Sequence, residues 1–194
     1  MMHTIIRRLV FCSVLMLMSA YLASSATAPH QAAALMSPDL DALALIQLSE
    51  QAQQRASEVF PDVILLQVYT DLTQTSFRFM DRTATTEIQV RVPASTAPLD
   101  QWPVHSHPLV IGGSGIDVRH LTIGPKRAAI AMLAGWPGCT RSGLGLYLFG
   151  TNGQLVWDIS CSTAEGVVKG KMDDQTGVFQ RTDGPALPPP TAMP

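Results

Sequence analysis

The spacing of apolar residues changes along the first half of the chain, and each change predicts a different element. From Leu45 to Val59, apolar side chains recur every three or four residues, which predicts an amphipathic helix that starts at Ser37 and ends near Phe60. Runs and alternations typical of strands follow, at residues 63–69, 75–80 and 87–92. This half is therefore predicted to form one helix and three strands.

The same order of elements is predicted after residue 120. Gly124 and Pro125 open a shorter helix with an apolar stripe, and Gly135 and Pro137 end it. Three further strand-like segments follow, at residues 144–149, 155–161 and 167–172. Between the two halves, residues 93–108 are rich in Pro, Ser and Thr, which predicts a loop.

This repeated order predicts the fold class. A helix with one apolar face needs a partner, and an antiparallel sheet with one apolar face supplies it. We therefore expect an α+β fold of two helix-plus-three-strand units, each helix packed on an antiparallel sheet, with the units either packed as neighbours or fused into one sheet. The expected segments are a signal peptide at 1–26, a first unit at 37–93, a loop and connector at 94–120, a second unit at 121–181 and a Pro-rich disordered tail at 182–194.

The first residues have the pattern of a secretory signal peptide. Arg7 and Arg8 precede 15 uncharged residues, from Leu9 to Ala23. That run is shorter than the roughly 18 residues or more of a membrane-spanning helix. Small residues follow, and Ala26 ends a signal-peptidase site. We therefore expect a secreted or periplasmic protein cut after Ala26, with membrane contact only through an uncleaved signal segment.

Charge argues against two classes of partner. The chain has 13 basic and 15 acidic residues, a net charge of −2. Removal of Arg7 and Arg8 leaves 11 basic residues against the same 15 acidic ones, a net charge of −4. Because nucleic acids and anionic membranes bind clustered Lys and Arg, neither is an expected partner.

Cleavage also makes the number of cysteines even. Cys12 lies in the signal segment, so Cys139 and Cys161 remain, and in an oxidising compartment they are expected to form a disulfide. A hairpin between the predicted strands 144–149 and 155–161 would set Leu144 nearly opposite Ser160 and bring the cysteines close together. The pair lacks the Cys-x-x-Cys spacing of a redox or metal site.

Three short stretches after residue 120 match a family pattern: the helix segment Ala128-Ala129-Ile130-Ala131, the strand Val156-Trp157-Asp158-Ile159 and the closing Asp174-Gln175-Thr176-Gly177-Val178. Over residues 121–180 they resemble a PepSY-type domain, an extracytoplasmic α+β module. The resemblance implies a PepSY-like or cystatin-like fold and a role in binding or inhibiting secreted peptidases, or in sensing envelope ligands. It implies no catalytic residues.

The candidate chemistry centres on His105 and His107. Residues i and i+2 of a strand share a face, so two imidazoles could reach one metal, with His120 among the further ligands. The pair lies between two prolines, however, which favours a solvated loop, and we expect no bound metal. Trp102, in the same polar segment, joins the pair as a candidate binding surface.

The sequence favours a binding protein over an enzyme. No Ser, Cys or Thr has an evident base and orienting acid nearby in the chain, so we expect no catalytic residue and no cofactor. The prediction is a non-enzymatic exported binding module whose partner is a protein or a small ligand. A different hypothesis is a secreted metal-dependent hydrolase that uses His105 and His107.

Export can be tested directly by N-terminal sequencing of the mature protein. The sequence should begin at Thr27, or at Pro29 if the second small-residue site is used, because signal peptidase cuts after small residues. A stable membrane-embedded species that starts at Met1 would contradict the prediction.

Overall fold

The computed structural model describes residues 40–71, 73–93, 97–110 and 113–183, all within one unit that begins at residue 34. The predicted signal peptide, the predicted cap Ser37 and the Pro-rich tail beyond residue 183 lie outside the described residues. Within the described ranges, no helix is both long and apolar enough to cross a membrane.

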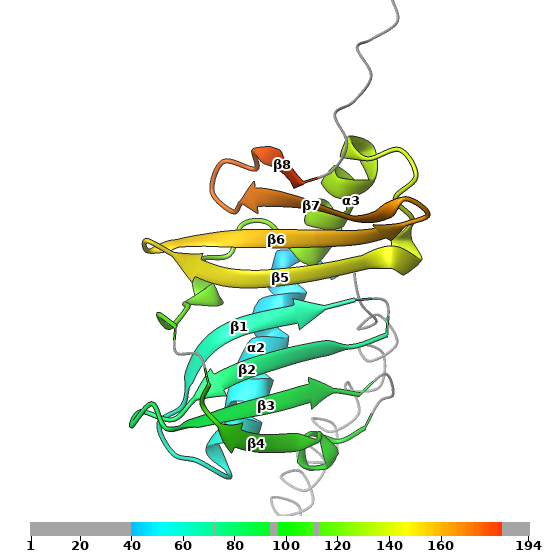
Figure 1. The fold of residues 1–194 in the computed structure, drawn as a ribbon. Coiled ribbons are helices and arrows are strands. Elements are labelled where there is room, and N and C mark those ends of the chain that lie inside the picture. The colour runs from blue at the N-terminus through cyan, green and yellow to red at the C-terminus, as the bar shows by residue number, and fades with distance from the viewer. Residues whose placement is uncertain (1–39, 72, 94–96, 111–112, 184–194) are drawn as a thin grey trace, which may run out of the picture. The chain divides into compact units, whose positions relative to one another are not determined.

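Eight antiparallel strands of the described residues form one sheet, in the order β4-β3-β2-β1-β5-β6-β7-β8 (Figure 1). The first half of the chain contributes β1 (Ile64–Thr70), β2 (Thr75–Met80), β3 (Thr86–Val92) and β4 (Val104–Pro108). The second half contributes β5 (Leu144–Thr151), β6 (Gln154–Thr163), β7 (Gly166–Asp173) and β8 (Phe179–Asp183). The two halves meet where β1 pairs with β5, so β4 and β8 are the edges.

Two α-helices cover one face of the sheet. Helix α2 (Ala42–Ser57) is capped by Asp41, whose Oδ1 accepts a hydrogen bond from the Ala44 amide at 2.8 Å. Helix α3 (Pro125–Gly135) has its proline in the first turn, where the missing N–H costs nothing. α2 contacts β2 and β3, and α3 contacts β5, β6 and β8. In Figure 1 both helices run behind the sheet.

The core lies between the helices and the sheet. Every second residue of the central strands faces the helices, as a pleated strand requires. The buried strand residues include Val68, Phe77, Phe79, Ile88, Val90, Leu146, Leu148, Trp157 and Ile159. The helices contribute mainly Leu45, Leu48, Ala52, Ala56, Ala128, Ala129 and Met132.

The expected fold of two helix-plus-three-strand units is wrong. Each helix is followed by four strands, and all eight strands belong to one sheet. The strands that the sequence pattern missed are the two edges, and β4 lies in the segment predicted as a loop. Edge strands bury little, so they lack a clear apolar alternation: β4 is exposed beyond Val104, and β8 has one apolar residue, Phe179.

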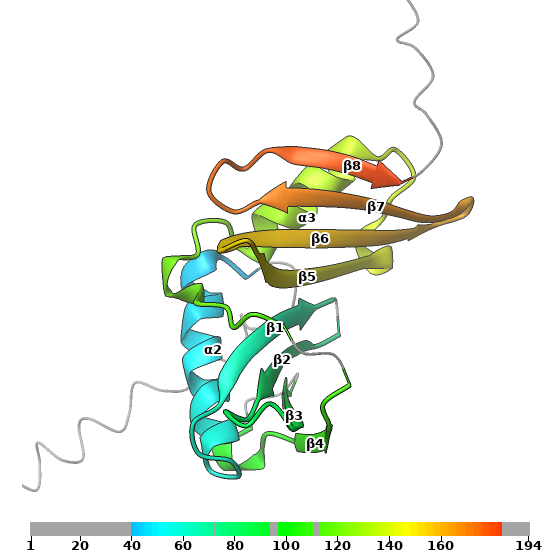
Figure 2. The same ribbon diagram turned by 60° about the vertical axis from the view of Figure 1, so that its left-hand side comes forward.

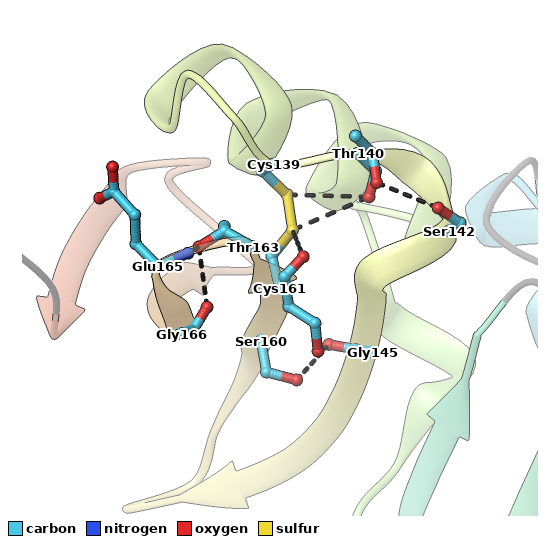
Figure 3. The surroundings of a disulfide bond; sticks show 10 residues. Cys139, Thr140, Ser142, Gly145, Ser160, Cys161, Thr163, Glu165 and Gly166 are labelled. Atoms are coloured by element: carbon cyan, nitrogen blue, oxygen red, sulfur yellow. Dashed lines mark hydrogen bonds between the residues drawn. A yellow bond between two sulfur atoms is a disulfide. The ribbon is translucent and has the colours of Figure 1, made fainter.

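The predicted disulfide between Cys139 and Cys161 is present, with a Cα–Cα distance of 5.9 Å (Figure 3). It ties the segment after α3 to strand β6. The predicted hairpin register is off by one residue, because Leu144 lies opposite Cys161 rather than Ser160. The turn has two residues, Asn152 and Gly153, and both have positive φ, 52° and 78°, as favoured two-residue hairpin turns require.

Loss of this disulfide should destabilise the fold. The bridge joins residues 22 positions apart. A disulfide that closes a loop of that length restricts the unfolded chain and adds about 3 kcal/mol to the free energy of unfolding. We expect the double variant Cys139→Ala/Cys161→Ala to lose about that free energy of unfolding in a urea titration. Reductant should destabilise the wild type and leave the variant unchanged. Two free thiols per chain in the unfolded, unreduced protein would contradict the bond.

Candidate functional site

One face of the sheet is turned away from the helices and forms the candidate site. In this part of the chain, no helix packs on that face, and Figure 2 shows α2 and α3 on the opposite side of the strands. We call it the open face, meaning the outward-pointing residues of β1 to β8. Its composition follows from strand alternation, because every residue that flanks a buried core residue points outward.

Two tyrosines lie at the centre of the open face. Tyr69 of β1 is directly opposite Tyr147 of β5, across the junction of the two halves. Their ring centroids are 4.6 Å apart and the planes are tilted by 40°, a favourable geometry for an aromatic pair. Tyr147 keeps 37% of its surface exposed. The pair therefore presents a large amphipathic side chain to any molecule that contacts the sheet.

The strand register places the tyrosines in the middle of a row that crosses the sheet. Each member of the row pairs with the next: Arg91, Ser76, Tyr69, Tyr147, Asp158, Lys171 and Gln180. Arg91 and Lys171 lie at matching positions, each two strands away from the nearer tyrosine. Five strand spacings separate them, or about 24 Å.

The tyrosine row carries an exposed cation on each side of the central pair. Arg91 of β3 and Lys171 of β7 are exposed, and Asp158, which lies opposite Lys171, is half-buried. Glu87 accepts hydrogen bonds from Arg78 Nε at 2.8 Å and Nη2 at 2.5 Å. These bonds hold the pKa of Glu87 below its ordinary value and raise that of Arg78. Arg78 and Glu87 therefore balance each other's charge, and Arg91 and Lys171 are the exposed cations that flank the tyrosines.

Tyr69 is held in place by Asp71. Its hydroxyl donates to Asp71 Oδ2 at 2.6 Å, and Asp71 Oδ1 accepts from the backbone and hydroxyl of Thr73, both at 2.7 Å. Burial and the nearby carboxylate raise the pKa of Tyr69, so it stays a neutral phenol. Burial also acts to raise the pKa of Asp71, but the hydrogen bonds outweigh it and lower that pKa. Tyr147 therefore packs against a ring of fixed orientation.

The structure separates the residues that we expected to form a binding surface. Trp102 is buried: it is 5% exposed, its Nε1 donates to the Ala97 carbonyl at 3.3 Å, and its own carbonyl accepts from Arg55 at 3.1 Å. Its position after the short η3 turn (Leu99–Gln101), which lies against α2, places the indole in the core. His105 and His107 are exposed on β4.

His120 lies elsewhere, beside a hollow of about 400 Å³ formed with the β5–β6 turn and Asp174. Strands β3, β2 and β1 stand between β4, which carries His105 and His107, and β5, which borders the hollow, so the two strands are roughly 19 Å apart. One metal cannot bind all three imidazoles. Among the described residues, no three His, Cys, Asp or Glu side chains gather at a common point.

The hollow is lined by groups that already serve the fold. Asp117 is held by Arg119 through bonds of 2.9 and 2.6 Å. Asp174 is buried, and its carboxylate accepts from the amides of Thr122 at 3.0 Å and Ile123 at 2.8 Å. These bonds anchor the β7–β8 turn to the start of α3. No local sequence pattern indicates this anchoring role of Asp174.

Sequence reasoning also missed the tyrosine row. Its members are spread from residue 69 to residue 180, and each is an ordinary outward position of its strand. Alternation alone could have placed them on the outer face of predicted strands. Only the β1–β5 register could have aligned them.

Comparisons with known proteins support the fold. No protein-family model and no curated protein matches the chain. A solved structure that resembles it is that of a putative lipoprotein from Clostridium difficile 630, with a TM-score of 0.51. The alignment covers 74% of this chain and 93% of the other, at 11% sequence identity. At that identity the likeness concerns the fold alone.

The Tyr69–Asp71 bond predicts a pH-dependent effect of Tyr69→Phe. The variant should raise the pKa of Asp71 toward its ordinary value, as measured by NMR titration, because the carboxylate loses a donor. It should also lose about 1–2 kcal/mol of stability at pH 7. A depressed carboxyl pKa stabilises the fold above the unfolded-state value of 3.8 and ceases to do so as pH falls through the folded-state value. The stability difference should therefore shrink in acid; an unchanged Asp71 pKa would contradict the assignment.

Proposed function

We propose that this protein is an exported, non-enzymatic binding module that docks a folded protein partner on the open face of its sheet. The observation that carries the proposal is the central pair in which Tyr147 is exposed and Tyr69 is fixed, with Arg91 and Lys171 on either side. Tyrosine and arginine dominate the binding energy of many protein interfaces. A row about 24 Å wide suits a macromolecular surface better than a small ligand, which prefers a concave site.

Charge favours a partner with an acidic surface. The expected mature chain has a net charge of −4, yet the exposed charged residues that flank the tyrosine pair, Arg91 and Lys171, are basic. Complementary potentials speed association and disfavour wrong partners. A partner that places an apolar or aromatic group on the tyrosines, with carboxylates toward Arg91 and Lys171, would match this arrangement.

Several observations support an extracytoplasmic location. The first 26 residues have the charge, apolar run and small-residue end of a signal peptide. The disulfide between Cys139 and Cys161 is of a kind that persists in oxidising compartments. The solved neighbour is described as a putative lipoprotein, which is consistent with the same setting.

A secreted peptidase is the partner class that we propose. The support is the PepSY-like resemblance of residues 121–180, which implies binding or inhibition of such enzymes. In this view the protein contributes no catalytic group and acts by occupying an acidic surface of the peptidase.

The proposal can be tested by comparing variants of the open face with a control on the other side. Immobilised protein would capture partners from envelope and culture fractions of the source organism, and each captured protein would then be purified and titrated. Tyr147→Ala and Lys171→Glu should each weaken Kd by about tenfold or more, because they remove the central aromatic or reverse a flanking charge.

The control Gln51→Ala changes an exposed residue of α2 and should bind as the wild type does. Peptidase activity of the purified partner, measured with and without the protein, tests whether the partner is a peptidase and whether binding inhibits it. If both face variants bound the partner with wild-type affinity, the open face would not be the docking surface.

A further inference from the structure

The histidine pair lies on a regular strand rather than in the loop that the flanking prolines suggested. In β4, His105 is opposite Gln89 and His107 is opposite Glu87 of β3. Backbone bonds from Arg91 N to Pro103 O at 3.1 Å and from Leu109 N to Thr85 O at 2.9 Å hold both ends of the strand. The backbone that carries the imidazoles is therefore ordered, and the reason for expecting no metal no longer applies.

The two imidazoles share one face and are both accessible. Residues two apart on a strand point the same way, with Cα atoms about 6.7 Å apart. Both side chains are exposed, as is Ser106 between them. β4 is an edge strand with one strand neighbour in the described part of the chain, so an ion can approach from the open face and from the side.

Three charged groups lie nearest the histidine pair: Glu87, Arg78 and Arg91. The acidic residue directly opposite His107 is Glu87, and side chains opposite each other on paired strands have Cβ atoms about 5 Å apart. Glu87 is occupied by Arg78, which limits its use as a ligand, but it balances the charge of that arginine. Arg91 of β3, diagonal to His105, is the cation that remains, and its Nη2 donates to Gln89 Oε1 at 3.5 Å.

We propose that His105 and His107 form a two-imidazole binding site for a divalent transition metal ion, of the class Zn²⁺, Cu²⁺ or Ni²⁺, on edge strand β4. Imidazole nitrogen suits these ions and does not suit Ca²⁺ or Mg²⁺, which take oxygen ligands. Structural zinc sites use four protein ligands and catalytic ones three. With two, the site is open and exchangeable, and water fills the remaining positions.

This site lies outside the tyrosine row that carries the proposed docking function. Strands β3 and β2 separate β4 from Tyr69, so neither His105 nor His107 belongs to the tyrosine row. Failure of either proposal would leave the other standing.

Calorimetric titration of the full-length protein with ZnCl₂, CuCl₂ and NiCl₂ in turn tests the site. We expect one ion per chain for at least one of these metals. His105→Ala and His107→Ala should each weaken binding by at least about tenfold, since loss of even an outer-shell contact has an effect of that size. His120→Ala is the matched control, because His120 is exposed but lies beside the distant hollow. It should bind as the wild type does.

Two results would overturn the proposal. One is the lack of saturable binding of all three metals up to about 1 mM, which corresponds to a binding free energy near −4 kcal/mol. The other is wild-type binding by the double variant His105→Ala/His107→Ala, which would place the ion elsewhere in the chain. If the alanine variants fail to fold, NMR of the wild type with Cu²⁺ decides: broadening confined to β3 and β4 supports the site, and broadening elsewhere refutes it.

Discussion

The pairing of β1 with β5 is the contact on which the single sheet depends. It is short and runs from Gln67 to Thr70 on β1. Before Gln67, the connector replaces β5 as the neighbour of β1: the Ile116 amide donates to the Leu65 carbonyl at 2.7 Å. Because the pairing is antiparallel and each half is a meander, the order of strands on one side of the junction mirrors the order on the other. Without it, the halves would be two four-stranded sheets with two more exposed edges.

The same pairing creates the chemistry of the open face. Tyr69 and Tyr147 are 78 positions apart in the chain, yet the register sets them directly opposite each other. A one-residue slip of either strand would turn the tyrosine of that strand toward the core and push Val68 or Leu148 outward. Burial of these aliphatic side chains on the helix side therefore fixes which residues a partner can meet on the other side.

Buried polar contacts hold the second half together around the start of α3. The Ile123 amide donates to Asp174 at 2.8 Å, and the Ile123 carbonyl accepts from Trp157 Nε1 at 2.8 Å. Both partners are almost fully buried, where an unpaired polar group would be costly. The first turn of α3 is also bonded to the first half of the chain, because the Lys126 amide donates to the Leu40 carbonyl at 3.0 Å. The disulfide adds a covalent link from the end of α3 to β6.

The sequence by itself determined the elements that bury apolar surface. The stripe of α2, the alternation of Ile88 and Val90 in β3, and the even pair of cysteines each carry a local signal strong enough to read. The tertiary structure alone decided three features that local burial does not encode. They are the edge strands β4 and β8, the register of β5 against β6 around the Asn152-Gly153 turn, and the pairing of Tyr69 with Tyr147. Edge strands gain their order from backbone hydrogen bonds to a neighbour, and cross-sheet alignment depends on pairing between distant segments, so neither leaves a pattern in the sequence nearby.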